Sequence, residues 1–260
     1  MCLLTFAYDV HPDYRFVFVG NRDEFYTRPS EPAHFWEQHP DFLAGRDSEA
    51  GGTWLGVTRN ARFAVVTNYR EPSVEPKKAQ RSRGLLVTGF LTGSATAAEY
   101  AAEVFTKGDA YNGFSLIVAD SDACLFLSNR DPAGPRQLGA GVYSLSNHIL
   151  DTPWPKVERA TRKMREFIAA DVSTDALLDL LADTSASDEP LQQTGLEPEV
   201  ERALSSMFVV TPTYGTRCTT ALTIGNDGQI QFAERSFDAT GSAAGEKLFV
   251  FDVKESLTSR

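Results

Sequence analysis

The 260-residue sequence is poor in the residues that build disulfide frameworks, metal centres and membrane spans. Its three cysteines, Cys2, Cys124 and Cys218, are odd in number and far apart, so they imply no disulfide framework and fit a reducing compartment. The four histidines lack metal-ligand spacing, which argues against a zinc site. No apolar run approaches the roughly 18 residues of a transmembrane helix. We therefore expect a protein with free thiols, no metal and no membrane span.

The sequence also has little positive charge. Its 25 Lys and Arg residues stand against 35 Asp and Glu, and the net charge of −10 argues against binding to nucleic acid. A basic cluster that includes Lys77, Lys78, Arg81 and Arg83 fits a solvated loop. A second interpretation is a docking patch for an anionic ligand group, because Arg pairs well with phosphate. The first residues show neither a secretory signal nor an Arg-rich presequence, so we expect a cytoplasmic protein.

Apolar runs separated by short polar turns recur along the chain and predict β-hairpins. The predicted strands are 3–7, 16–19, 53–57, 63–67, 114–119, 124–127, 142–145, 207–210, 219–224, 229–233 and 248–253. Helical spacing is found at 83–91, 96–105, 153–169, 175–181 and 197–204, and a loop is expected at 182–193. Strands that are apolar on both faces need a covering layer on each side. We therefore predict an α+β fold, a four-layer αββα sandwich of two mainly antiparallel sheets, in a single domain over residues 1–260.

Cys2 is the most informative residue of the sequence. If Met1 is trimmed, Cys2 carries both a thiol and a free α-amine, whose pKa of roughly 7.7–8.0 lets it act as a base near neutrality. A nucleophile with its own general base on the same residue needs no histidine. The alternative is a small apolar residue that begins a buried strand.

Polar side chains lie where several predicted strands begin or end, which is where sites are commonly built on a rigid scaffold. These residues are Asn21, Arg22, Asp23, Asn68, Asn147 and Arg217. Near a thiol, an Asp can hold the α-amine, an Asn can donate to an oxyanion, and an Arg favours the thiolate. Taken singly, each asparagine could equally cap a turn, and Arg22 and Asp23 could form a local ion pair.

Seven motifs, in the same order, resemble the NRDE family, also called the transport and Golgi organisation protein 2 family. They are Cys2, Gly20-Asn21-Arg22-Asp23-Glu24-Phe25 with Arg28-Pro29, Gly51-Gly52-Thr53-Trp54-Leu55-Gly56, Thr67-Asn68-Tyr69, Tyr111-Asn112-Gly113-Phe114, Leu145-Ser146-Asn147 with Thr152-Pro153-Trp154, and Tyr214-Gly215-Thr216-Arg217. More distantly, the chain is similar to N-terminal-nucleophile (Ntn) hydrolases of the bile-salt hydrolase and penicillin V acylase type. This resemblance implies an Ntn-hydrolase fold.

The resemblance also implies a set of catalytic residues. They are Cys2 as nucleophile, Asp23 against its α-amine, Asn68 and Asn147 as oxyanion donors, and Arg217 as the late arginine. In those hydrolases the first Arg precedes Asn at the strand end. Here the order is Asn21-Arg22-Asp23, which leaves the direction of Arg22 open.

Two functions follow from the resemblance. The first is a Cys2 hydrolase of a non-peptide amide or thioester of a small amphipathic acyl ligand, which requires no cofactor. The second is a non-catalytic protein that binds or transports haem or acyl-CoA. The ligand-binding residues expected for either are Asn21, Arg22, Glu24, Trp54 and Tyr69. The sequence has no C-x-x-C-H haem attachment signature, and Cys2, His34 and His148 are the candidate axial ligands.

Overall fold

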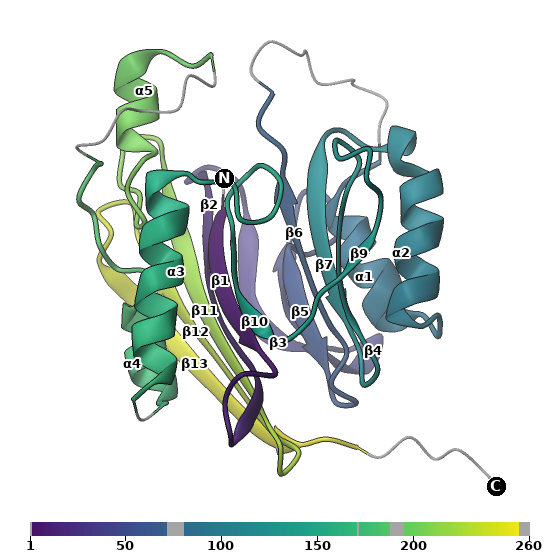
Figure 1. Ribbon diagram of the computed structural model, residues 1–260. Coiled ribbons are helices and arrows are strands. Elements are labelled where there is room, and N and C mark those ends of the chain that lie inside the picture. The colour runs from purple at the N-terminus through teal and green to yellow at the C-terminus, as the bar shows by residue number, and fades with distance from the viewer. Residues whose placement is uncertain (1, 72–80, 171, 188–194, 255–260) are drawn as a thin grey trace, which may run out of the picture.

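Two antiparallel sheets packed face to face form the centre of the structure, a computed structural model that describes residues 2–71, 81–170, 172–187 and 195–254 (Figure 1). In spatial order, the first sheet consists of β10 (Gly141–Leu145), β1 (Cys2–Tyr8), β2 (Tyr14–Phe25), β11 (Tyr214–Gly225), β12 (Gln229–Phe237) and β13 (Ala243–Asp252). The second consists of β3 (Ser30–Trp36), β4 (His39–Asp47), β5 (Leu55–Thr58), β6 (Phe63–Asn68), β7 (Phe114–Ala119), β8 (Cys124–Ser128) and β9 (Arg136–Gln137).

Helices cover the outer faces of both sheets. Helices α3 (Pro155–Ile168) and α4 (Thr174–Asp179) pack on the first sheet, and α1 (Gly84–Thr92) and α2 (Ala97–Thr106) pack on the second (Figure 1). The remaining helical segments are η1 (Gly108–Ala110) and α5 (Pro198–Ala203). The arrangement confirms the predicted four-layer αββα sandwich.

Strand alternation explains why the sandwich has three apolar layers. Along β2, Phe16 and Phe18 point between the sheets, whereas Val17 and Val19 point towards α3 and α4. A separate apolar layer lies between the second sheet and its two helices, around Phe90. Each of these layers removes apolar surface from water, at roughly 25 cal/mol per Å².

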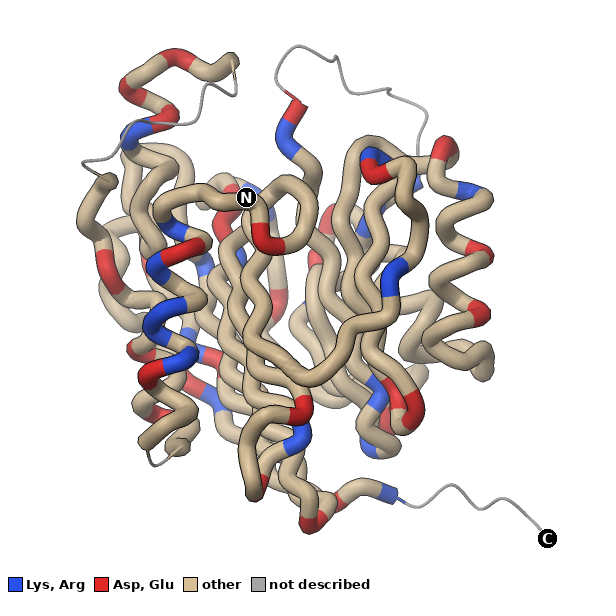
Figure 2. The backbone as a smooth tube through the Cα atoms, in the orientation of Figure 1, with Lys and Arg blue, Asp and Glu red and all other residues tan. Residues whose placement is uncertain are grey.

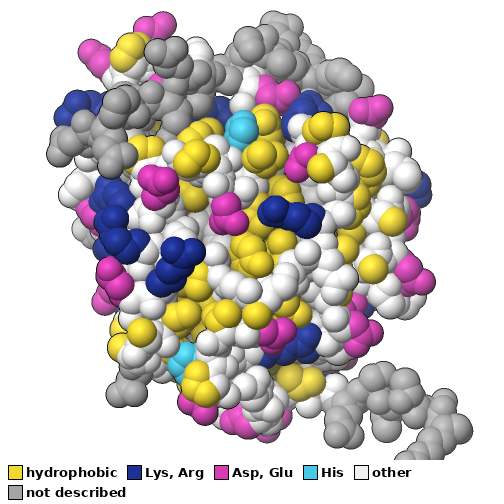
Figure 3. Space-filling model, viewed as in Figure 1, with side chains coloured by type: hydrophobic (Ala, Val, Ile, Leu, Met, Phe, Trp, Pro, Cys, Tyr) yellow, Lys and Arg dark blue, Asp and Glu magenta, His cyan; other side chains and the backbone are white. Residues whose placement is uncertain are grey.

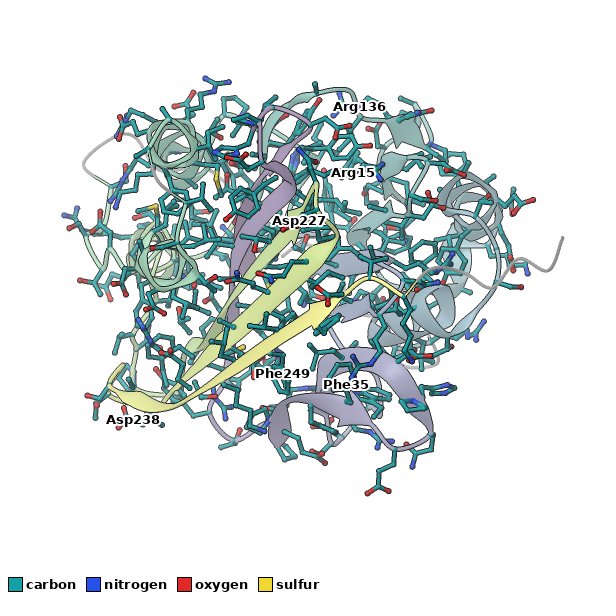
Figure 4. The ribbon with its side chains drawn as sticks, turned by 90° about the horizontal axis from the view of Figure 1, so that it is seen from below. Arg15, Phe35, Arg136, Asp227, Asp238 and Phe249 are labelled. Carbon is teal, nitrogen blue, oxygen red and sulfur yellow. The ribbon has the colours of Figure 1, made fainter. Side chains whose placement is uncertain are left out.

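The lower end of the sandwich is closed by aromatic contacts between the two sheets. Figure 4 shows Phe35 of β3 beside Phe249 of β13, and their ring centroids lie 5.9 Å apart. Charged residues lie mainly on helices and loops, and fewer lie along the central strands (Figure 2). On the face seen in Figure 3, acidic and basic side chains are interspersed rather than gathered by sign.

The structure corrects two parts of the predicted element list. The predicted strand at 207–210 is wrong: Met207, Phe208 and Val209 are buried apolar residues, and Val210 forms an isolated bridge with Gly215. The hairpin of β3 and β4 was not expected from the sequence. In the predicted loop 182–193, residues 188–193 lie outside the described part of the chain, as do Lys77 and Lys78.

Candidate active site

Cys2 begins β1 at the end of the sandwich, where the layer between the sheets opens into a cavity. Its side chain alternates in phase with Leu4 and Phe6, which belong to the core between the sheets. The residue is 8% exposed and lies in the wall of the cavity. Its partner across the ladder is Arg22 of β2. The thiol is therefore packed in protein on one side and open to the cavity on the other.

Asn147 holds the backbone nitrogen of Cys2. Asn147 Oδ1 accepts from Cys2 N at 3.2 Å, and Nδ2 donates to the carbonyl of Asn68 at 2.9 Å. The residue has a φ of 52°, in the left-handed region that Asn tolerates better than most residues. Asn147 thus connects β1 in the first sheet to the end of β6 in the second. This geometry suits a residue that positions the nitrogen of Cys2, rather than the oxyanion donor expected from the sequence.

Asn68 takes a different position from Asn147. It is the last residue of β6, is exposed and lines the cavity. Among the residues that the structure describes, its side-chain amide makes no hydrogen bond. The Nδ2 group of Asn68 can therefore donate to a ligand held in the cavity beside Cys2.

Asp23 lies near the start of β1, behind Cys2, and is only 2% exposed. Its Oδ1 accepts from the hydroxyl of Thr216 at 2.8 Å, and its carbonyl accepts from Tyr214 Oη at 2.8 Å. Burial raises the pKa of the Asp23 carboxyl, while the charge of Lys156 and the Thr216 hydrogen bond oppose that rise. Sequence reasoning placed Asp23 correctly at this end of β2 but gave no sign of Lys156.

The pKa of the Cys2 thiol is raised from its ordinary value, mainly because the thiol is buried. The negative charge of Asp23 also raises it, whereas the guanidinium of Arg22 and a backbone hydrogen bond from Asp23 lower it. The charge of Arg22 favours the thiolate, but desolvation outweighs it. The thiol therefore needs a base to become a nucleophile near neutral pH.

Arg217 lies in the cavity wall, and its guanidinium is bonded to the backbone. Nη1 donates to the carbonyls of Phe25, Tyr26 and Arg28 at 3.0, 3.3 and 3.1 Å. The ladder between β11 and β2 shifts register at this residue, between Thr216 and Cys218. Arg217 therefore anchors the segment after β2, and a role in setting the pKa of Cys2 stays a prediction.

The residues predicted to bind ligand divide into two groups. Arg22, Glu24 and Trp54 line the cavity. Asn21 does not: it is fully buried on the opposite face of β2, where Nδ2 donates to the carbonyls of Leu181 and Met207.

Tyr69 also points elsewhere. Its hydroxyl lies 2.7 Å from His148 Nε2, and the two rings are 4.6 Å apart. We therefore assign neither Asn21 nor Tyr69 to the ligand site.

The cavity has a volume of about 730 Å³, within the range of small-molecule sites, and charged side chains dominate its wall. The arginines among the lining residues are Arg22, Arg28, Arg46, Arg81, Arg83 and Arg217. The acidic lining residues are Asp23, Glu24, Glu31, Asp47, Glu49 and Glu234. Part of this charge is paired, because Arg28 Nε lies 2.8 Å from Asp47 Oδ2. A cavity of this kind suits a ligand with a polar or charged group.

Arg83 belongs to the basic cluster that the sequence offered as a docking patch for an anionic group, and it lines the cavity. It precedes α1 and faces Cys2 and Glu24 closely enough for their charges to influence its pKa, which burial lowers. Among the described residues it has no acidic partner within 4 Å, and Nη1 donates to the carbonyl of Gly113. A Cβ on Gly52 would lie 2.8 Å from the carbonyl carbon of Gly84, so a side chain at position 52 would clash with the backbone of α1. The two glycines therefore allow the start of α1 to pack closely against the cavity wall.

Within the described ranges, no group of three or more His, Cys, Asp or Glu side chains is placed to hold a metal ion. In the same ranges, no helix is long and apolar enough to cross a membrane.

The fold and the site together define a class: an α+β sandwich protein with a cysteine thiol at the start of its first strand, facing a polar cavity. A model of the Transport and Golgi organisation 2 family matches residues 1–239. A Transport and Golgi organization 2 homolog from mouse is 36% identical over 258 residues, covering 91% of this chain and 93% of the mouse protein. The chain belongs to the Transport and Golgi organisation 2 family.

Two solved structures share a lower similarity. The Caenorhabditis elegans ortholog of N-acylethanolamine-hydrolyzing acid amidase is 13% identical, with a TM-score of 0.45, over 85% of this chain and 92% of its own. A mutant of conjugated bile acid hydrolase from Clostridium perfringens is 8% identical, with a TM-score of 0.49, over 97% of this chain and 92% of its own.

Proposed function

We propose that this protein is an N-terminal-cysteine hydrolase that cleaves a non-peptide amide or thioester of a small amphipathic acyl compound. The observation that carries the proposal is the setting of Cys2. Its nitrogen is held by Asn147 Oδ1 at 3.2 Å, while its thiol faces a cavity that Asn68 also lines, and the Asn68 amide makes no hydrogen bond to the described residues. This setting supports a mechanism in which the α-amine of Cys2 is the base, its thiol the nucleophile and Asn68 the oxyanion donor, without a histidine.

The proposed reaction begins after Met1 has been removed. The α-amine of Cys2 accepts the thiol proton as Sγ attacks the carbonyl carbon of the substrate, and the carbonyl π electrons move onto oxygen. Asn68 Nδ2 donates to this oxyanion. When the intermediate collapses, the C–N or C–S bond breaks and the α-ammonium returns the proton to the leaving group. Water then attacks the acyl thioester with the same amine as base, the C–Sγ bond breaks, the α-ammonium returns the proton to the Cys2 thiolate, and a carboxylic acid leaves.

The electrostatics of the site favour proton transfer during attack over a preformed thiolate. Burial raises the pKa of the Cys2 thiol, so the neutral thiol predominates near pH 7. An unperturbed α-amine has a pKa of roughly 7.7–8.0, which is near the optimum for a general base at that pH.

The experiment that tests the proposal compares two cysteines of the same cavity. Cys218 also lines the cavity and is 9% exposed, so Cys218→Ser is a matched control for Cys2→Ser and Cys2→Ala. Each protein is incubated with a panel of short-chain acyl amides and acyl thioesters, after intact mass has shown that Met1 is absent. Hydrolysis that is lost on substitution of Cys2 but kept in Cys218→Ser supports the proposal. Equal rates in Cys2→Ala and the unmodified protein would exclude it.

A second candidate, binding without catalysis, is favoured by the arginines of the cavity. Arg22, Arg28 and Arg83 line it, and an anionic ligand such as acyl-CoA would contact guanidinium groups there. Stoichiometric binding with no product over time supports this candidate.

Haem fits the described site less well than an anionic acyl ligand does. His148 is bonded to Tyr69 and to Thr152, and His34 lies beside the carbonyl of Pro32. Neither histidine is among the described residues of the cavity wall, which leaves Cys2 as the candidate axial ligand.

A further inference from the structure

Lys156 is a buried lysine in the first turn of α3, next to the proposed active site. It is 3% exposed, and Nζ donates to the carbonyl of Leu204 at 2.9 Å. Lysine is almost never fully buried unless its charge is paired. A single neutral carbonyl compensates a buried ammonium only in part, so the environment of Lys156 requires a nearby negative charge.

Asp23 is an acidic side chain on the sheet face that the helices cover, and its charge acts on Lys156. Along β2 it alternates in phase with Val17 and Val19, which face the helices, and α3 packs on this side of the first sheet. The charge of Asp23 raises the pKa of Lys156, but burial outweighs it and lowers that pKa to about 8. Burial acts on Asp23 in the opposite direction and favours its neutral form.

Other charged groups face the same pair. Arg70, which follows β6, lowers the pKa of Lys156, and the Cys2 thiol on β1 raises it when ionised. Glu201 on α5 is 8% exposed and acts on Arg70. Arg22, next to Asp23 on β2, lowers the pKa of Asp23. The resulting group contains three basic and two acidic side chains, in addition to the thiol. Lys156 and Asp23 belong to the layer directly behind Cys2.

We propose that Lys156 is a positioning residue that keeps the Asp23 carboxylate ionised behind Cys2. This inference rests on the proposed function, because the ionised carboxylate would stabilise the α-ammonium of Cys2 that forms during attack. Without Lys156, burial would shift Asp23 towards the neutral acid, which cannot stabilise an ammonium by charge. Lys156 touches no reacting atom and acts through Asp23.

The test measures the titration of Asp23 itself. Full-length protein is labelled with ¹³C at the aspartate carboxyl groups, and the Asp23 signal is assigned with Asp23→Asn. We expect Lys156→Met to raise the Asp23 titration midpoint by about one to three pH units, the usual effect of losing an opposite charge nearby. An unchanged midpoint in Lys156→Met would overturn the proposal.

Lys163 provides the matched control. It lies on the same helix and also donates to a backbone carbonyl, that of Leu180 at 3.4 Å. We expect Lys163→Met to leave the Asp23 titration where it is, so an equal effect of the two substitutions would also overturn the proposal. Lys156→Arg keeps the charge and is expected to retain the wild-type midpoint.

A measurement on the unmodified protein avoids any loss of folding in the variants. Because burial lowers the pKa of Lys156 to about 8, the Asp23 carboxyl signal should show a second step at that pH, and the step should persist in protein whose α-amine is blocked by an uncleaved N-terminal extension. A flat signal between pH 7 and 9 contradicts the proposal.

The hydrolysis assay separates this inference from the proposed function. If Asp23 responds to Lys156 but no amide or thioester is cleaved, the inference stands and the proposed function fails. If hydrolysis depends on Cys2 but Asp23 does not respond to Lys156, only the inference fails.

Discussion

At the scale of single residues, two asparagines that look alike in sequence have different tasks. Asn147 is buried and bonded on both sides of its amide, to Cys2 N and to the carbonyl of Asn68. Asn68 is exposed, with a side chain that makes no hydrogen bond among the described residues. Substitutions at the two positions should therefore have different effects on activity and on stability.

We expect Asn68→Ala to lower kcat by about 10²–10³-fold, the usual cost of losing one oxyanion donor, with little change in Tm. Asn147→Ala should lower both kcat and Tm, because it breaks the connection between the sheets and puts alanine at a φ of 52°. Steady-state kinetics and thermal melts of both variants check this. A large loss of Tm in Asn68→Ala, or an unchanged Tm in Asn147→Ala, contradicts the assignment.

Arg83 is the residue we expect to recognise an anionic group of the ligand, because it faces Cys2 without an acidic partner within 4 Å in the described ranges. Arg83→Met should weaken binding of a medium-chain carboxylate to Cys2→Ala protein by about tenfold or more, since a charged hydrogen bond contributes about 1.5–3 kcal/mol. Titration calorimetry measures this binding. Arg136 of β9 lies outside the cavity wall, so Arg136→Met is the control, and equal weakening by both variants contradicts the role of Arg83.

At the scale of elements, Glu234 of β12 attaches β3 to the first sheet. Its Oε1 accepts from the backbone N–H of Ala33 at 2.7 Å, and Lys247 of β13 donates to the carbonyl of Ala33 at 3.0 Å. Burial raises the pKa of Glu234, while the Ala33 hydrogen bond opposes that rise. The β3–β4 hairpin, which carries several residues of the cavity wall, is thereby fixed against the opposite sheet.

The raised pKa of Glu234 predicts a sign for the pH dependence of stability. The folded state binds more protons than the unfolded state between the ordinary Glu pKa and the higher folded value. The free energy of unfolding contributed by this group is therefore greatest below its unfolded pKa and falls as pH rises through the folded pKa. We expect Glu234→Gln to flatten this fall in denaturant titrations from pH 4 upwards. A steeper fall in Glu234→Gln would contradict the assignment.

The same scale shows which parts of the fold could be predicted from sequence. Hairpins with continuous apolar runs, such as β1 with β2 and β7 with β8, were predicted because an apolar run bounded by polar turns indicates a strand from the local sequence alone. The β3–β4 hairpin was missed because Pro32 and Pro40 argue against strands and because its pairing is irregular. The apolar run at 207–210 suggested a strand, yet of its residues only Met207 belongs to the apolar layer between the first sheet and its helices, and Val210 is exposed.

The sequence predicted the site residues that lie on β2 beside Cys2 better than those that come from other parts of the chain. Arg22 and Glu24 reach the cavity, but Asn21 lies on the opposite face of the same strand, a consequence of alternation that a motif does not reveal. Lys156 comes from a helix that only tertiary packing brings to the site, and other Lys and Arg residues surround it in the sequence, so it did not stand out. Arg83 was named as part of a basic cluster that could dock an anionic group, and the structure places it in the cavity wall.

At the scale of the whole molecule, the polar and charged side chains of the candidate site lie at one end of the four-layer sandwich. The core between the sheets is apolar along most of its length and is closed at one end by Phe35 and Phe249 (Figure 4). At Cys2 it opens into the cavity. The buried charges of Asp23 and Lys156 lie in the layer behind that opening. Burying such charges costs stability, and their retention there fits a site that needs them.

The most direct test of this account is the rate of Cys2 alkylation as a function of pH, in two forms of the protein. One form has lost Met1, as shown by intact mass, and the other carries an uncleaved N-terminal extension that blocks the α-amine. We predict that the alkylation rate of the processed form rises near the α-amine pKa of roughly 7.7–8.0, whereas the extended form reacts only at higher pH, because burial raises the pKa of its thiol. Identical pH profiles, or retention of Met1 in the natural protein, would contradict the claim that Cys2 carries its own base.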